Sequence, residues 1–173
     1  MNRAQLEHII RASAAIAGDD EIYVLGSQSI LGAFPAAPPE LTVSMEADVA
    51  PKNRPEREVL VEGSIGELSP FHTTFGYYAD GVETAMLTLP EGWEKRVVIV
   101  QNENTRFAKG LCLEPHDCAV SKLFAGREKD LEFVASLLRH GMVNGRLIRE
   151  RICTVNRNRD KMQHVESLLD RLA

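Results

Sequence analysis

The N-terminal part of the chain combines one helical pattern with two extended ones. Residues 3–17 carry apolar side chains at helical spacing, and Gly18 follows them, so a helix is predicted to end there. Glu21–Leu25 is short, apolar and partly β-branched, which predicts a strand. Leu41–Val49 predicts a second strand, and the proline-rich residues 34–40 before it predict a loop.

The middle of the chain has short strand patterns separated by turn signals. Leu60–Leu68 predicts a short helix. Phe71–Tyr78 then predicts a strand, the Asp-Gly pair at 80–81 a turn, and Thr84–Leu89 the returning strand of a hairpin. Arg96–Val100 has the clearest strand pattern in the sequence.

The last third of the chain has apolar residues at helical spacing. A helical region is predicted from Pro115 to about His140, with Gly126 as a candidate break, and residues 144–171 predict two more helices. This order predicts an α/β (α+β) fold, in which a small mixed sheet with flanking helices precedes a C-terminal helical subdomain. The expected division is residues 1–111 for the α/β core and 112–173 for the helical subdomain.

The composition narrows the class of protein. Of the 173 residues, 44% are hydrophobic and 26% charged, which is ordinary for a soluble globular protein. The net charge of −5 provides no global positive field for nucleic acid. The three cysteines lack the paired spacing of a disulfide framework or a zinc knuckle. Because no apolar segment approaches the roughly 20 residues of a membrane span and the N-terminus has no signal-peptide pattern, we expect a cytoplasmic protein.

Two short motifs in the first two predicted strands suggest a site. The first strand ends at Gly26-Ser27, where glycine permits close backbone approach and a following helix N-terminus could hold a phosphate. In the second strand, Glu46 and Asp48 share one face, about 6.6 Å apart along the chain, and could coordinate Mg²⁺. Each motif alone also has a simpler interpretation, namely a plain turn and a solvent-facing pair on an edge strand.

A third pattern lies in the helical region. If residues 112–140 form one helix, Arg127 falls within its apolar stripe, so either the helix breaks nearby or this side chain reaches a polar site. Lys122 and Lys129 share a face that Asp130 flanks, and a lysine there could hold a triphosphate. The alternative is a solvated lattice of charges on the helix surface.

Taken in order, these motifs resemble those of the nucleotidyltransferase superfamily, specifically its AbiEii-like branch, which contains the toxins of type IV toxin–antitoxin pairs. The pattern is Gly-Ser, then an acid-x-acid strand, then a lysine on a helix, then an aspartate shortly after. The matching residues are Gly26, Ser27, Glu46, Asp48, Lys122 and Asp130. Glu46 stands where relatives usually have aspartate.

The resemblance implies attack of an acceptor hydroxyl on the α-phosphorus of an NTP, with pyrophosphate leaving. The implied acceptor is RNA, tRNA or protein, and an antitoxin protein is a further candidate partner. Glu46 and Asp48 would bind Mg²⁺ or Mn²⁺, and Asp130 would complete or orient the site. The implied catalytic residues are Glu46, Asp48, Lys122 and Asp130, and the implied nucleotide-binding residues are Gly26, Ser27, Lys122, Arg127 and Lys129.

One expected feature of that superfamily has no obvious counterpart in the sequence. Many relatives carry a third metal-binding carboxylate on a later strand, but Arg96–Val100 contains none. Asp80, on the expected turn, and Glu103, after the strand, are the candidates. An incomplete site favours an alternative function, in which a protein of the same fold binds nucleotide or RNA, or an antitoxin, without transferring a nucleotide.

A dense basic stretch near the C-terminus has two interpretations. It could face RNA phosphates, or it could form the polar surface of the last helices. Its members are Arg146, Arg149, Arg151, Arg157, Arg159 and Lys161.

Overall fold

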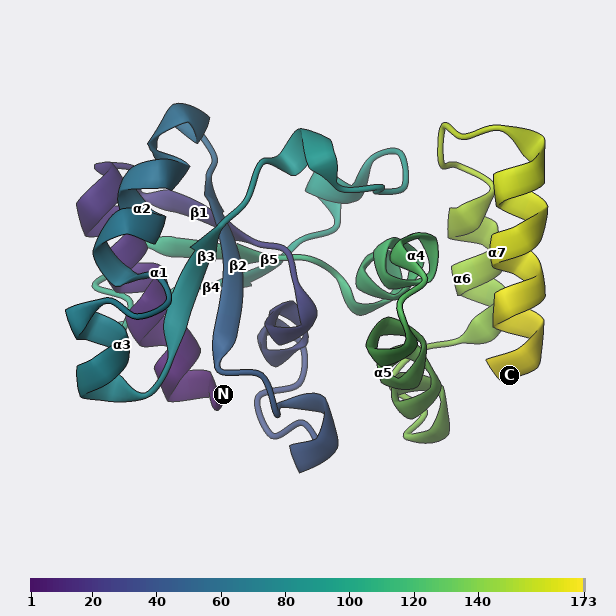
Figure 1. The fold of residues 1–173 in the computed structure, drawn as a ribbon, viewed down its shortest axis with the longest axis horizontal. Helices are drawn as coiled ribbons and strands as arrows, with labels where there is room; N and C mark the ends of the chain where they lie inside the picture. Colours follow the sequence, from purple (N-terminus) through teal and green to yellow (C-terminus); the bar gives the residue numbers. More distant parts are fainter. Residues whose placement is uncertain (173) are drawn as a thin grey trace.

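The computed structural model describes residues 1–172, which form a sheet with helices at one end of the molecule and four helices at the other (Figure 1). The strands are β1 (Glu21–Val24), β2 (Glu46–Pro51), β3 (Tyr78–Gly81), β4 (Val98–Val100) and β5 (Lys109–Cys112). The α-helices are α1 (Arg3–Ala17), α2 (Glu58–Ile65), α3 (Pro70–Phe75), α4 (Pro115–Ala125), α5 (Glu128–Arg139), α6 (Gly145–Ile152) and α7 (Arg159–Leu172). Short 3₁₀ helices include η1 (Ser27–Gly32) and η2 (Pro39–Leu41).

The five strands form one mixed sheet in the order β3-β2-β1-β5-β4. β1 pairs in parallel with β5 and antiparallel with β2, whereas β2 and β3 are parallel and β4 and β5 antiparallel. This architecture confirms the predicted α/β class. It also makes the two strands of the Gly-Ser and acid-x-acid motifs neighbours, because β1 and β2 are hydrogen-bonded to each other.

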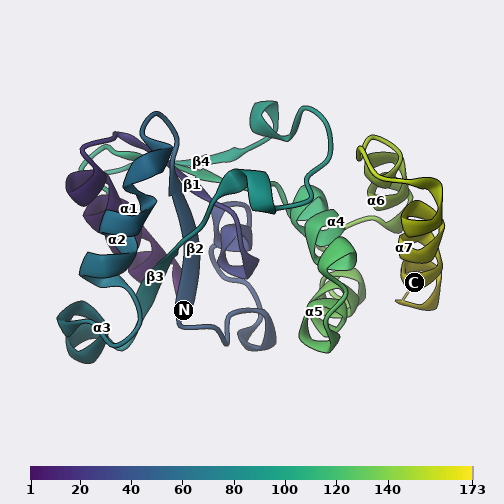
Figure 2. The ribbon, with the colours of Figure 1, turned by 45° about the horizontal axis from the view of Figure 1, so that its top comes forward.

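One face of the sheet is covered by α1 and α2, which Figure 2 shows on the same side of β2 and β3. The apolar stripe of α1 is fully buried there, as the periodicity of residues 3–17 predicts, and Ala47 and Val49 of β2 pack into the same cluster. A capping box at Asn2 begins α1, and Gly18 ends it in the left-handed conformation. The other face of β2 is therefore left for polar side chains.

The C-terminal helices α4–α7 pack around a second apolar cluster, to which Ile30 of η1 and Leu41 of η2 also contribute. The predicted long helix breaks at Gly126, which adopts a left-handed conformation (φ 68°) and ends α4. Asp117 of α4 is fully buried and accepts hydrogen bonds from Arg96 and Arg151, which lie on the loop before β4 and on α6. The division at residues 111/112 stays a prediction.

The predicted hairpin in the middle of the chain is wrong. Phe71–Tyr78 was expected to be a strand, but its first part belongs to α3, because Ser69 caps a helix whose first residue is Pro70. The expected turn at 80–81 is part of β3. Thr84–Leu89 is not a returning strand, since η4 (Thr84–Met86) bends the chain there.

The bounds of one strand and the existence of another also differ from the expectation. β2 starts at Glu46 rather than at Leu41. Leu41 packs instead in the apolar cluster of the C-terminal helices, and Val43 and Met45 are exposed before the strand begins. β5 has no counterpart among the predicted strands. Within residues 1–172, no helix has both the length and the apolar character needed to cross a membrane.

Candidate active site

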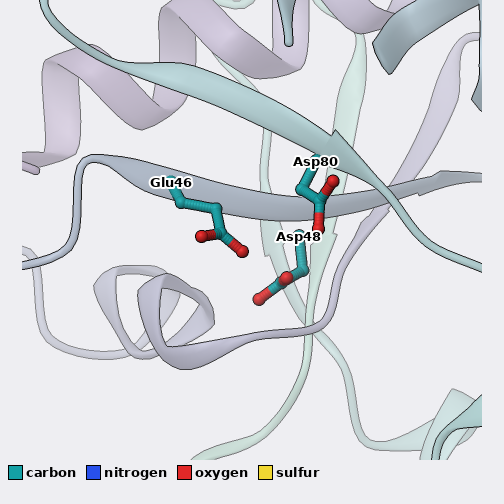
Figure 3. A group of neighbouring side chains, drawn as sticks. All are labelled: Glu46, Asp48 and Asp80. Carbon is teal, nitrogen blue, oxygen red and sulfur yellow. The ribbon is translucent and has the colours of Figure 1, made fainter. Parts of the chain in front are cut away.

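Three carboxylates from two neighbouring strands converge on the open face of the sheet. Glu46 and Asp48 lie two residues apart on β2, so both point away from the face that α1 and α2 cover. The parallel register of β2 and β3 places Asp80 opposite Asp48. One carboxylate oxygen of each residue lies within 4.8 Å of those of the other two. Figure 3 shows the three side chains close together beside β2 and β3. This cluster is suited to a divalent metal ion with oxygen ligands.

The electrostatics of this carboxylate cluster also favour a cation. Burial, and next the charge of Glu46, raise the pKa of Asp48 to about 6. Burial and Glu46 raise the pKa of Asp80 as well. After burial, the negative charge of Glu46 is the next cause of both shifts, so it disfavours the ionised forms of Asp48 and Asp80. A divalent ion between them would remove that repulsion, so the donor atoms and the charge both fit a magnesium or manganese ion.

Gly26 is required by the position of Asp48. A Cβ atom at residue 26 would lie 1.4 Å from Asp48 Oδ2, so only glycine leaves room for this carboxylate. The backbone dihedrals of Gly26 (φ −85°, ψ −161°) are open to other residues, so the requirement is space rather than conformation. The Gly-Ser motif and the acid-x-acid motif are therefore two halves of one packing arrangement.

A cleft of about 800 Å³ opens in front of the carboxylates, between the sheet and α5. Ser27, the first residue of η1, lies on its wall. Gly26 lies behind Asp48, as described above. The cleft is lined by the other residues of the predicted site, namely Ser27, Glu46, Asp48, Lys122, Arg127, Lys129 and Asp130.

The wall opposite the carboxylate cluster carries positive charge. Lys122 Nζ lies 3.2 Å from Asp130 Oδ1, and Arg127 Nε donates to Asp130 Oδ2 at 2.6 Å. Burial alone would raise the pKa of Asp130, but the hydrogen bonds from Arg127 and the charge of Lys122 outweigh it and lower the pKa. Asp130 therefore stays ionised and holds both cations at the cleft. The break at Gly126 frees Arg127 from the apolar stripe and exposes it.

One further part of the cleft was not predicted from the sequence. Phe133, Ser136 and Arg139 of α5 also line the cleft, as does Leu41 of η2. The only sequence signal for them is helical spacing, because Phe133 and Ser136 follow Lys129 by four and seven residues and so share its helix face.

The structure also distinguishes the two candidates for a third carboxylate. Asp80 was expected on a turn, but it lies on β3 and joins Glu46 and Asp48. Glu103 is exposed on the loop after β4 and does not line the cleft. The acidic site therefore has a third carboxylate, that of Asp80, and is no longer interpreted as incomplete.

Three of the six members of the basic stretch near the C-terminus form ion pairs within the protein. Arg146 pairs with Glu150, Arg149 with Asp170, and Arg151 with the buried Asp117. For these three residues, the pairing favours the polar surface of the last helices over an RNA-binding surface.

The sequence of the chain matches a known protein family. Residues 5–168 match the family model described as nucleotidyltransferase of unknown function (DUF6036). No curated protein and no solved structure gave a significant match. The match covers almost the whole chain, including the carboxylate cluster and the positive wall that faces it. The chain therefore belongs to this family of nucleotidyltransferases of unknown function.

Proposed function

We propose that this protein transfers a nucleoside monophosphate from an NTP to an acceptor hydroxyl in a reaction that depends on Mg²⁺ or Mn²⁺. The observation that carries the proposal is the carboxylate cluster of Glu46, Asp48 and Asp80, which faces Lys122 and Arg127 across one cleft. Acidic metal ligands opposite fixed cations are the arrangement that phosphoryl transfer needs, since catalysis is mostly positioning and charge stabilisation.

The three carboxylates would hold the metal. A bound divalent ion would supply positive charge to the phosphate oxygens and orient the NTP for in-line displacement. Tyr78 donates a hydrogen bond to Glu46 Oε2 at 3.3 Å, and this contact orients the longer glutamate arm. Gly26 keeps the space that Asp48 occupies.

The positive wall would hold the triphosphate. Lys122, Arg127 and Lys129 supply charges that a pyrophosphate leaving group requires, and Ser27 adds a hydroxyl to the lining of the same cleft. We assign Asp130 the orienting role, because both of its oxygens are engaged by Lys122 and Arg127 and its lowered pKa makes it a poor base.

The proposal is tested by Mg²⁺-dependent transfer of label from each of the four α-labelled NTPs to a whole-cell extract that contains RNA, protein and small molecules. Asp48→Asn should lower transfer roughly 100-fold or more, because it removes a group that organises transition-state charge. Asp20→Asn is the matched control, since Asp20 is exposed and lines no cleft. Full transfer by Asp48→Asn would refute the proposal.

The AbiEii-like branch and the toxin role remain hypotheses. They are supported by the order of the Gly-Ser, acid-x-acid, lysine and aspartate motifs. If the protein is such a toxin, induced expression of the wild type should arrest bacterial growth, whereas Asp48→Asn should not, and an antitoxin protein would restore growth. Equal growth with both forms would argue against the toxin role but not against nucleotide transfer.

A further inference from the structure

A second cleft meets the carboxylate cluster from another direction. It has a volume of about 630 Å³ and lies among α2, the segment between α2 and α3, and β3. Glu46 and Asp80 line both this cleft and the larger one, so the two clefts share the candidate metal ligands. Tyr78, which orients Glu46, also lies on its wall.

The two clefts approach the shared carboxylates from opposite sides. The larger cleft is formed by η1, η2, α4 and α5, and the smaller one by α2 and the segment that leads to α3. Figure 1 shows these two groups of helices on opposite sides of β2 and β3. An in-line displacement requires the attacking oxygen and the leaving group to lie on opposite sides of the phosphorus. If pyrophosphate leaves toward Lys122, the acceptor must therefore come from the side of the smaller cleft.

The smaller cleft has a chemical character different from that of the larger one. Its charged lining consists of carboxylates, with Glu62 and Glu67 added to the shared Glu46 and Asp80, and none of its described lining residues is lysine or arginine. Its apolar lining includes Val59 and Leu68, whose side chains are highly exposed. A phosphate backbone would be repelled there, whereas a protonated amine or guanidinium on a short carbon skeleton would be attracted.

We propose that the smaller cleft binds the acceptor, and that the acceptor is an alcohol that carries a cationic group near its reacting hydroxyl, rather than RNA. This inference rests on the proposed function and names the second substrate class of the same site. The acceptor oxygen forms a bond to the α-phosphorus and gives its proton to solvent water, while the bond from that phosphorus to the bridging oxygen breaks and pyrophosphate leaves with that electron pair. Alcohols with a nearby cationic group occur in basic peptides that contain Ser, Thr or Tyr, and in aminosugars.

The test compares acceptor pools under identical conditions. Label transfer from α-labelled NTPs is measured to Lys/Arg-rich peptides with a Ser, Thr or Tyr, to aminosugars, and to total RNA. The variant is Glu62→Gln with Glu67→Gln, whose positions are exposed, so folding is preserved. Glu94→Gln with Glu103→Gln is the control of equal charge change, since both residues are exposed and line neither cleft. Metal-dependent NTP binding without acceptor is measured in parallel by calorimetry.

We expect label on one of the two cationic pools, which also tells a peptide from an aminosugar acceptor. The cleft variant should raise the KM for that acceptor about tenfold, as expected for the loss of two partly exposed ion pairs, with the NTP affinity unchanged. Label on RNA alone, no label on a cationic pool, or an unchanged KM in the variant would overturn the inference. If NTP binding persists in those cases, the proposed function stands, whereas absence of metal-dependent NTP binding would count against both.

Discussion

At the scale of single residues, the site depends on how closely Asp48 approaches the backbone at Gly26. The sequence presents the two residues as parts of separate motifs, but their strands are adjacent and the carboxylate fills the space where a side chain would start. The cluster of Glu46, Asp48 and Asp80 is then placed by strand register, because β2 and β3 align Asp48 with Asp80.

Gly26→Ala should therefore damage the metal site more than the fold. The added methyl would displace Asp48, so we expect Mn²⁺ affinity in the presence of NTP to fall at least about tenfold, the size seen when groups around a metal site are disturbed. Calorimetry measures the affinity. Gly145→Ala is the control, because its Cβ would meet only Leu138 at 3.9 Å. Equal Mn²⁺ affinity in wild type and Gly26→Ala would contradict this account of the site.

Residue patterns named most of the charged residues that meet at the candidate site, but the third carboxylate only as one of two candidates. Alternation along β2 was enough to place Glu46 and Asp48 on the open face. Lys122 and Asp130 were recognised from their order in the chain, and Arg127 from its place within the apolar stripe of the expected helix. Asp80 could be named only as a weak candidate, because β3 has only four residues. The threonine and aromatic residues of α3 just before it have a strand-like pattern of their own, so the strand was predicted there instead.

At the scale of elements, long amphipathic helices were predictable and short elements were not. The helix at residues 3–17 and the last two helices have several turns of apolar periodicity. By contrast, α3 has six residues, too few for a period, and its threonine and aromatic residues favour strands. β5 contains Gly110, although glycine is uncommon in strands. Glycine fits at this position because a Cβ atom there would lie 2.3 Å from Ile10 Cδ1 of α1.

The turn between α1 and β1 makes a prediction about pH. Asp19 is buried and accepts hydrogen bonds from the backbone amides of Glu21, Asn53 and Arg54, which joins this turn to the segment after β2. Burial would raise the pKa of Asp19, but hydrogen bonds from Asn53 and these amides lower it below 3.8. Asp19→Ala should cost about 2 kcal/mol of unfolding free energy at pH 7.

The pH dependence follows from the direction of that shift. Because the pKa of Asp19 is lower in the folded state, its stabilisation is present above the unfolded pKa and is lost as pH falls through the folded value. The difference between wild type and Asp19→Ala should therefore narrow below pH 4, measured by urea unfolding. Asp20→Ala is the neighbouring control, since Asp20 is exposed. A difference that is equally large at pH 3 and pH 7 would contradict this assignment.

At the scale of the whole molecule, the carboxylate cluster lies where two clefts meet. The larger cleft joins the sheet to the C-terminal helices and carries cations, whereas the smaller one lies against α2 and carries carboxylates. No sequence pattern revealed the smaller cleft. Apart from Glu46, its residues come from α2 and the segment after it, and from α3 and β3, whose secondary structure was predicted incorrectly. We propose that the larger cleft holds the nucleotide and the smaller one the acceptor.

The most direct measurement of the central claim compares Asp80→Asn with Glu103→Gln, the two candidates for the third carboxylate. Transfer of label from α-labelled NTPs to whole-cell extract is measured with Mg²⁺ for both variants and the wild type, after circular dichroism has confirmed that each is folded. We predict a loss of roughly 100-fold or more for Asp80→Asn and wild-type transfer for Glu103→Gln. Wild-type transfer by Asp80→Asn would contradict the assignment of the cluster as the catalytic metal site.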